Sequence, residues 1–595
     1  MKLGAGDAGQ GAAALEAGLG VGAAWRPRPG RARRWALGAG ALGLLVGAAL
    51  AVVEALGEVN AGGWPLAARF FAAVVEPRLD AAFLEVVTSA ALTTLAYAVL
   101  GTVLALVLGL TAGPLLAQAG WEAGGRRPPR AIRGAWVVAR GALALPRGVH
   151  EVVWALVLLA ILGLDPLVAV LAIGLPYGAV TAKVTADLLD EAPRAPMTAL
   201  LIAGASRPVA LLHGLVPAAL GDLVAYAFYR FECSLRAAAI LGIVGAGGLG
   251  FQLALSFQAL RYGEMWTIIA ALVVLAAAVE GWSGAVRRRL GAERRAGCAP
   301  QDGSAPLAGP HPPQIAPAAR PGPPARPGRD PVVVGSLVLV GVLAVGSAWW
   351  LAVDLSTLWA SRTLSLFGQV LADAWPPDFA GAGGTALLGQ ALTTLAMAAL
   401  GAGLAFVLAL GLVVPGAAAL HLRPSARGGR VRRPLGRLPR GLLRAPLLML
   451  RAVPPPVWAF VLLLVLFPGI LPGAVALALY NLGVLGRLFA EAVEEVDERP
   501  LRALEGVGAT RAQVIVCGLV PAALTRFAAH GLERWEMAIR DTVVVGLVGA
   551  GGLGLALDGQ LASFAFGAVA ATLLVLLALT FAVDLAGSAL RRALR

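Results

Sequence analysis

Two pairs of opposite charges lie inside otherwise apolar stretches of this chain, and the pairs repeat. Glu232 and Arg236 are four residues apart, as are Glu536 and Arg540, so each pair would share one face of a helix. Charged groups in apolar helices are costly and usually face protein or a polar cavity. The pairs therefore either brace neighbouring helices or place their arginines along the route of an anionic solute.

The offset of 304 positions between these pairs recurs along the chain and indicates a duplication. It also relates Trp154 to Trp458 and connects two glycine-rich runs. The runs comprise Gly245, Gly247, Gly248 and Gly250 in the first copy, and Gly549, Gly551, Gly552 and Gly554 in the second. A duplicated membrane domain commonly forms its transport path between the repeats.

The glycine runs match the pattern G-x-G-x-x-G of dinucleotide-binding proteins. That pattern requires a strand, a turn and a helix, with an acidic residue further on. Both runs lie instead beside apolar segments of membrane-spanning length. Glycine is therefore expected here to permit close helix packing or a break near the pore.

The composition is that of a membrane protein: 58% of the residues are hydrophobic, 14% are charged, and the mean hydropathy is +0.79. Apolar runs of about 20 residues recur, each long enough to cross the hydrocarbon core as a helix. The net charge of +14 comes from arginines clustered in short loops between these runs. Membrane topology accounts for such loops, so no nucleic-acid partner is expected.

The pattern predicts an all-α membrane protein with about twelve transmembrane helices, arranged as two six-helix repeats in parallel orientation. Basic loops alternate so that both termini are expected to be cytoplasmic. The predicted spans lie near 36–56, 86–116, 144–163, 167–188, 265–285, 332–353, 386–416, 444–467, 470–491, 520–547 and 562–587, with a further span that begins near 214. The predicted domains are a basic N-terminus (1–35), a first membrane repeat (36–290), a Pro/Gly-rich cytoplasmic linker (291–331) and a second membrane repeat (332–590).

Two loops at equivalent positions predict a helix, a sharp glycine turn and a second short helix. Their key residues are Gly204, Ala205, Ser206 and Pro217 in the first copy, and Gly508, Ala509, Thr510, Gln513 and Pro521 in the second. Thr510 and Gln513 have the spacing of a capping box, whereas Val209 replaces the glutamine in the first copy. Such a loop either inserts into a cleft of another protein or is an ordinary connector, and its duplication favours insertion.

These loops resemble the "EAA" loop of the membrane subunits of binding-protein-dependent ABC importers. The glycine and proline of that motif stand in both copies, but Thr198 and Arg502 replace its acidic residue, and Glu505 follows in the second copy only. The segments 229–251 and 533–554 closely resemble phosphonate-type permeases. The resemblance covers roughly 80–290 and 380–590.

The resemblance implies a type I ABC importer-like permease, with two permease domains fused in one chain. Such a protein moves phosphonate, phosphate or a similar oxyanion across the inner membrane by alternating access. Its partners would be two copies of an ABC ATPase and an extracytoplasmic solute-binding protein. Lys2 and Lys183 are the only lysines and neither lies in a Walker A sequence, so ATP and Mg would be used by the separate ATPase. No cofactor, metal or catalytic site is expected on this chain.

Other functions stay open at this point. Methionine-type permeases carry a similar glycine run, so the glycines alone do not identify the solute. A secondary transporter with two parallel six-helix halves would also fit the periodicity, but it needs an ion-coupling site and acidic residues within the spans are few. An intramembrane enzyme would need a paired nucleophile and base, and the sequence shows none.

Overall fold

The computed structural model describes residues 60–119, 130–297, 331–421 and 438–594, which are almost entirely helical and contain no β-strand. The N-terminal segment, the predicted span near 36–56 and most of the predicted linker lie outside these ranges. Nine described helices are long and apolar enough to cross a membrane, or up to eleven if two bent pairs each count as one span. Together with the predicted span near 36–56, this agrees with about twelve helices.

The first half contains four long helices that match predicted spans: α4 (Ala81–Leu116), α9 (Pro166–Glu191), α12 (Val216–Leu241) and α14 (Tyr262–Gly297). Side-chain caps set the beginnings of α4 and α9. Asp80 accepts a hydrogen bond from the Phe83 amide at the start of α4. The hydrogen bond from Arg78 lowers the pKa of this carboxyl group. Asp165 caps α9 in the same way.

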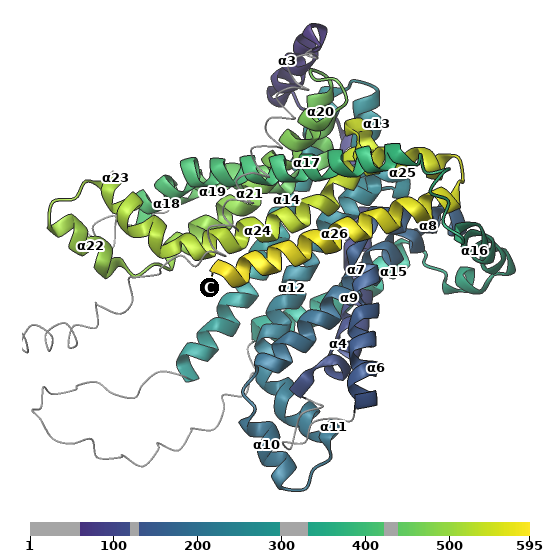
Figure 1. Ribbon diagram of the computed structural model, residues 1–595. Helices are drawn as coiled ribbons and strands as arrows, with labels where there is room; N and C mark the ends of the chain where they lie inside the picture. The colour runs from purple at the N-terminus through teal and green to yellow at the C-terminus, as the bar shows by residue number, and fades with distance from the viewer. Residues whose placement is uncertain (1–59, 120–129, 298–330, 422–437, 595) are drawn as a thin grey trace, which may run out of the picture.

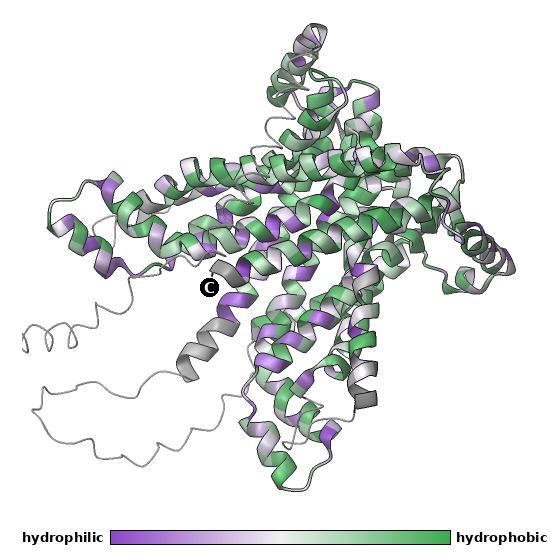
Figure 2. Ribbon diagram, viewed as in Figure 1, coloured by the Kyte–Doolittle hydropathy of each residue, from purple (hydrophilic) through white to green (hydrophobic). Residues whose placement is uncertain are grey.

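The second half repeats this arrangement. Its long helices are α15 (Pro331–Trp350), α17 (Thr385–Leu408), α21 (Ile470–Glu494), α24 (Val520–Val545) and α26 (Phe566–Leu594). Helix α17 continues through a π-helical turn into α18 (Val414–His421). Apolar residues cover most of the length of these helices (Figure 2), as expected for helices that face lipid or one another.

The predicted spans near 144–163 and 444–467 are both helical, but each is sharply bent rather than a single straight helix. In the first half, α6 (Arg130–Ala142) and α7 (Ala144–Gly148) meet α8 (Glu151–Leu162) at 82°; in the second, α19 (Leu438–Ala452) meets α20 (Pro455–Leu463) at 83°. Pro454 has an extended backbone and lacks an amide hydrogen, which ends α19. At the equivalent position His150 is extended, and its ring accepts a hydrogen bond from the Val152 amide.

Helices of each half pack against helices of the other half. Helix α15 of the second half packs along α4 of the first. Helix α3 (Trp64–Ala72) contacts α20, and α16 (Ser361–Ala374) contacts α8 at the equivalent place. The Asn60 amide also donates a hydrogen bond to the Val465 carbonyl at 2.9 Å. The two repeats therefore form one interlocked unit with residues of both in a shared core.

The halves diverge as two arms away from this shared region (Figure 1). One arm ends in α10 (Ala195–Ile202) and α11 (Arg207–Ala210), and the other in α22 (Glu498–Gly506) and α23 (Arg511–Gln513). These are the two loops singled out by the repeat. They lie far apart, at the tips of separate arms.

Candidate functional site

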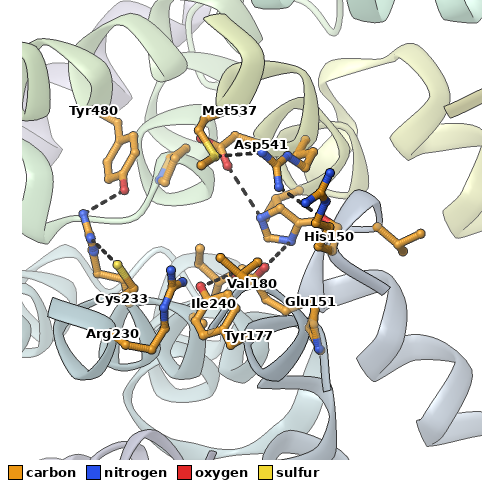
Figure 3. Close-up of a pocket in the computed structure, with 18 of the residues that line it drawn as sticks. His150, Glu151, Tyr177, Val180, Arg230, Cys233, Ile240, Tyr480, Met537 and Asp541 are labelled. Atoms are coloured by element: carbon orange, nitrogen blue, oxygen red, sulfur yellow. Dashed lines mark hydrogen bonds and ion pairs between the residues drawn. The ribbon is translucent and has the colours of Figure 1, made fainter. Parts of the chain in front are cut away.

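A cavity of about 150 Å³ lies between the two halves, lined by residues of α7, α8, α9 and α12 from one and α20, α21 and α24 from the other (Figure 3). Its lining is strongly polar for a site among membrane helices. The polar residues are Arg147, His150, Glu151, Tyr177, Tyr229, Arg230, Cys233, Arg236, Tyr480, Arg534, Arg540 and Asp541. We call this space the central cavity.

Positive charge predominates in the central cavity. Five arginines face two carboxylates, those of Glu151 and Asp541, which leaves an excess of three positive charges when His150 is neutral. Four of the arginines form two equivalent pairs at the 304-residue offset, Arg230 with Arg534 and Arg236 with Arg540. Guanidinium groups recognise oxyanions through paired N–H donors. The cavity can therefore hold an oxyanion near the pseudo-symmetry axis.

The arginine side chains are positioned but not fully paired. Arg236 Nη1 donates to the Tyr480 hydroxyl at 3.0 Å, and Arg540 Nη1 donates to the Arg147 carbonyl at 3.0 Å. The buried Nε atoms of Arg230, Arg534 and Arg540 have no hydrogen-bond partner among the described residues. Buried donors without acceptors are costly, so an acceptor-rich ligand would stabilise this arrangement.

The two glutamates do not pair with the arginines four residues further on in the same helix. Glu232 contacts Arg287 of α14 at 3.6 Å, and Glu536 contacts Arg591 of α26 at 2.6 Å. No ion pair in the described ranges joins Glu232 to Arg236 or Glu536 to Arg540. The glutamates point toward the last helix of their own half, whereas the arginines point into the central cavity. The glutamates thus contact a neighbouring helix and the arginines line the central cavity, and a role of the arginines in the solute's route stays a prediction.

Several cavity residues were not predicted from the sequence. The ring nitrogens of His150 lie 3.5 Å from Glu151 and 3.6 Å from Asp541, which joins the two halves (Figure 3). The Tyr177 hydroxyl donates to Glu151 at 3.2 Å. The positions equivalent to His150 and Glu151 are prolines in the second half. Comparison of the repeats therefore gave no signal for them.

The glycine runs form a turn followed by a tight contact. After α12, a π-helical turn leads into α13 (Gly248–Gln258), and the backbone of Gly245 has φ 107°. A Cβ on Gly245 would meet nothing within 4 Å, so the left-handed backbone, rather than close packing, requires glycine there. On Gly250 a Cβ would lie 1.9 Å from the Ala239 carbonyl oxygen. The second copy repeats both features at Gly549 and Gly554.

The other glycines of the runs are also required either by a left-handed backbone alone or by a left-handed backbone together with a close contact. Gly247 and Gly551 have φ of 92° and 95°, and neither would bring a Cβ within 3.5 Å of another atom. Gly248 and Gly552 combine positive φ with a close approach, because a Cβ would lie 2.5 and 2.7 Å from threonine hydroxyl oxygens. Each run is therefore a compact break between a long helix and a short one.

A threonine from the first long helix of each half holds this break. Thr94 Oγ1 accepts a hydrogen bond from the Leu249 amide at 2.9 Å, and Thr394 Oγ1 accepts one from the Leu553 amide at 2.9 Å. Both threonines belong to the repeated segment Leu-Thr-Thr-Leu-Ala. These bonds satisfy amides at the starts of α13 and α25 (Gly552–Ala562), which have no partner inside the helix.

Replacing Thr94 or Thr394 with valine is expected to destabilise the protein by about 1–3 kcal/mol, because a buried amide loses its acceptor while the shape is kept. Thermal inactivation of the purified protein in detergent would measure this as a lower midpoint. Thr393→Val is the matched control, since no hydrogen bond of the Thr393 side chain is found among the described residues. An equal midpoint for Thr394→Val and Thr393→Val would contradict the role of the hydroxyl group.

The two loops have the predicted glycine turns, but their second helices are not separate. Gly204 and Gly508 have φ of 88° and 90°. Thr510 and Gln513 form the predicted capping box, whereas Ser206 makes no side-chain capping bond. The short helices run without interruption into the next long helices, over 207–246 and 511–550. Pro217 and Pro521 lie in the first turns of α12 and α24, directly after a π-helical turn in each half.

Comparison with known families places this architecture in a class. Residues 137–291 and 428–595 each match the family described as the inner membrane component of binding-protein-dependent transport systems. The chain belongs to this family, and the two matches show two permease domains fused in one chain. It is thus a membrane subunit of an ABC importer.

Individual relatives carry related names. The chain is 27% identical to the phosphate-import permease protein PhnE of Mycolicibacterium smegmatis, over 86% of both chains. It is 34% identical to the phosphite transport system permease protein PtxC of Stutzerimonas stutzeri, over 44% of this chain and 88% of that protein. It is 31% identical to the putative cryptic phosphonate transport system permease protein PhnE2 of Escherichia coli, over 20% of this chain and 96% of that protein.

Proposed function

We propose that this permease carries a phosphonate, phosphate or similar oxyanion across the inner membrane by alternating access. The observation that supports this most directly is the pair of equivalent arginine sets, Arg230 with Arg236 and Arg534 with Arg540, around one cavity between the halves. The names of the relatives point to the same chemical class of solute.

The central cavity suits transient rather than tight binding. Arginines approach it from both halves, so a tetrahedral oxyanion can accept hydrogen bonds on two sides. Glu151 and Asp541 offset part of the positive charge and hold His150 between them. A transport site must bind strongly enough to admit the solute and weakly enough to release it. The mixed charge of the lining meets both needs.

ATP hydrolysis would act on the two loops at the arm tips. Two copies of a separate ABC ATPase, with ATP and Mg, would engage 189–213 and 493–520 from the cytoplasm. Closing of the ATPases would draw the diverging arms together and change access to the central cavity. A solute-binding protein would deliver the anion at the opposite face. This orientation places both termini in the cytoplasm.

Each loop is attached firmly to its arm, as force transmission requires. Met197 of α10 and Leu501 of α22 are equivalent residues, and both are almost fully buried. Each packs against a glycine of the following π-helical turn, Gly214 and Gly518. A movement of either loop would therefore be passed directly into α12 or α24.

Gly214→Ala is expected to lower the amount of solute transported per ATP hydrolysed at least about twofold, whereas Gly518→Ala is expected to have a smaller effect. A Cβ on Gly214 would lie 2.8 Å from backbone atoms of Met197, which cannot move without shifting α10. A Cβ on Gly518 would meet only side-chain tips of Leu501 and Leu504, at 2.8 and 2.9 Å. Parallel assays of uptake and ATPase activity in proteoliposomes measure the ratio. Equal losses in both variants would contradict the rigid contact at Gly214.

Reconstitution tests the proposed function. The permease, its ATPase and its binding protein are placed in vesicles, and uptake of phosphate, phosphite, methylphosphonate and methionine is measured with and without ATP. ATP-dependent uptake of at least one of the oxyanions, in preference to methionine, is expected. Uptake that ignores ATP and collapses with an uncoupler would identify a secondary transporter instead, and preferential methionine uptake would remove the oxyanion proposal.

A further inference from the structure

A charged cluster joins the two halves on the arm side of the central cavity. One carboxylate oxygen of Glu280, on α14 of the first half, contacts Arg487 of α21 at 2.9 Å, and the other contacts Arg451 of α19. We propose that Arg451 and Arg487 form a second anion-binding site, which Glu280 occupies and thereby closes until the transported oxyanion displaces it. The inference rests on the proposed oxyanion route.

The charged cluster borders a small cavity that lies between two larger ones. A small cavity of about 30 Å³ shares Arg236 with the central cavity and shares Glu280 and Arg451 with a third, much larger cavity. The large cavity, of about 1270 Å³, opens between α14, α19 and α21 and is lined by further arginines. The small cavity has room for little more than a water molecule. The ion pair of Glu280 and Arg451 therefore separates two wider spaces.

The chemistry of the cluster permits an exchange of anions. Glu280 presents two oxygens to two guanidinium groups, and a phosphate or phosphonate also has at least two oxygens to present to the same donors. The side chain of Arg451 is only 14% exposed, so leaving it without an anion would be costly. Exchange avoids that state, because the incoming oxyanion replaces the carboxylate as it leaves. Arg236 lies between the two sites and borders both spaces.

The pseudo-symmetric positions carry the same residue classes but do not make the same contact. Asp584, Arg147 and Lys183 are the equivalents of Glu280, Arg451 and Arg487 at the 304-residue offset. In the described part of the chain Asp584 makes no ion pair, and its side chain is one methylene shorter than that of Glu280. Arg147 instead lines the central cavity. Among the described residues the closed site is therefore present on one side only, so the pseudo-symmetry is broken at this position.

Cysteine accessibility in the complete transporter tests this proposal. The reporter is Ala276→Cys in the small cavity, with Cys233, Cys298 and Cys517 replaced by serine, and the complex is held in lipid nanodiscs. The rate of modification by the neutral reagent N-ethylmaleimide is expected to rise about tenfold in Glu280→Gln. Asp584→Asn is the matched control in the other half and should change the rate less than about twofold.

Inorganic phosphate then serves as the probe for the second site. It is expected to slow modification in the Glu280→Gln variant, and this protection should disappear when Arg451→Gln and Arg487→Gln are added. The double substitution Glu280→Arg with Arg451→Glu should restore slow modification, which controls for simple misfolding of Glu280→Gln. Equal rates in Glu280→Gln and Asp584→Asn, or protection that survives loss of both arginines, would overturn the proposal. Because the assay needs no uptake, its outcome is independent of whether the oxyanion function itself fails in vesicles.

Discussion

Uptake by the double variant Arg236→Gln and Arg540→Gln is expected to fall about a hundredfold or more relative to the unmodified permease. The substitutions remove two equivalent positive charges from the central cavity and leave shorter, uncharged side chains that can still form hydrogen bonds. Loss of a buried charged partner costs an oxyanion several kcal/mol of binding free energy. Initial rates of ATP-driven oxyanion uptake, measured in vesicles with equal amounts of inserted protein, give the effect.

Arg526→Gln is the control for this experiment. It makes the same substitution on the same helix, but Arg526 is half-exposed and pairs with Glu495 at the surface at 2.8 Å. Exposed pairs contribute little to stability, so uptake should stay near its normal rate. Normal uptake by the double variant would show that the arginines only brace the helices. ATPase activity stimulated by the binding protein shows, in parallel, whether the loops still respond.

The internal repeat made much of this site predictable. The 304-residue offset picked out Arg236 and Arg540 before any contact was known, and the apolar runs predicted most of the long helices. The offset identifies these arginines because the two halves carry the same residue at equivalent positions. Glu232 and Glu536 show where this reasoning stops, since spacing along a helix does not reveal which neighbouring helix a side chain faces.

Features that differ between the halves could not be predicted in this way. His150 joins Glu151 to Asp541 across the interface, but its equivalent is Pro454. The sharp bends near 150 and 454 have different local causes, a capping histidine and a proline run, and hydropathy alone predicts a straight helix for both. The closed contact of Glu280 likewise depends on tertiary geometry. Asymmetry is thus the part of this protein that only the structure reveals.

Gly250→Ala and Gly554→Ala are each expected, as single variants, to abolish accumulation of folded protein in the membrane. The added methyl carbon would lie 1.9 Å from the Ala239 carbonyl oxygen in the first case and 2.3 Å from the Val543 carbonyl oxygen in the second. Both oxygens belong to the backbone of the preceding long helix, so relief requires that α13 or α25 move away from it. Such a movement would break the hydrogen bonds that Thr94 and Thr394 accept from the Leu249 and Leu553 amides. Size-exclusion profiles of detergent extracts measure the folded fraction.

Gly559→Ala supplies the matched control, because it lies on α25 as well and a Cβ there would meet nothing within 4 Å. Alanine is the better helix former by about 1 kcal/mol, so this variant should be at least as stable as the unmodified protein. A folded, active Gly554→Ala would mean that the glycine run adapts to a side chain and is not a fixed break. A loss in Gly554→Ala alone would assign the tight contact to one half only. Loss in both variants, with Gly559→Ala intact, would show that the two repeats depend on the same backbone contact beside the arginine cavity.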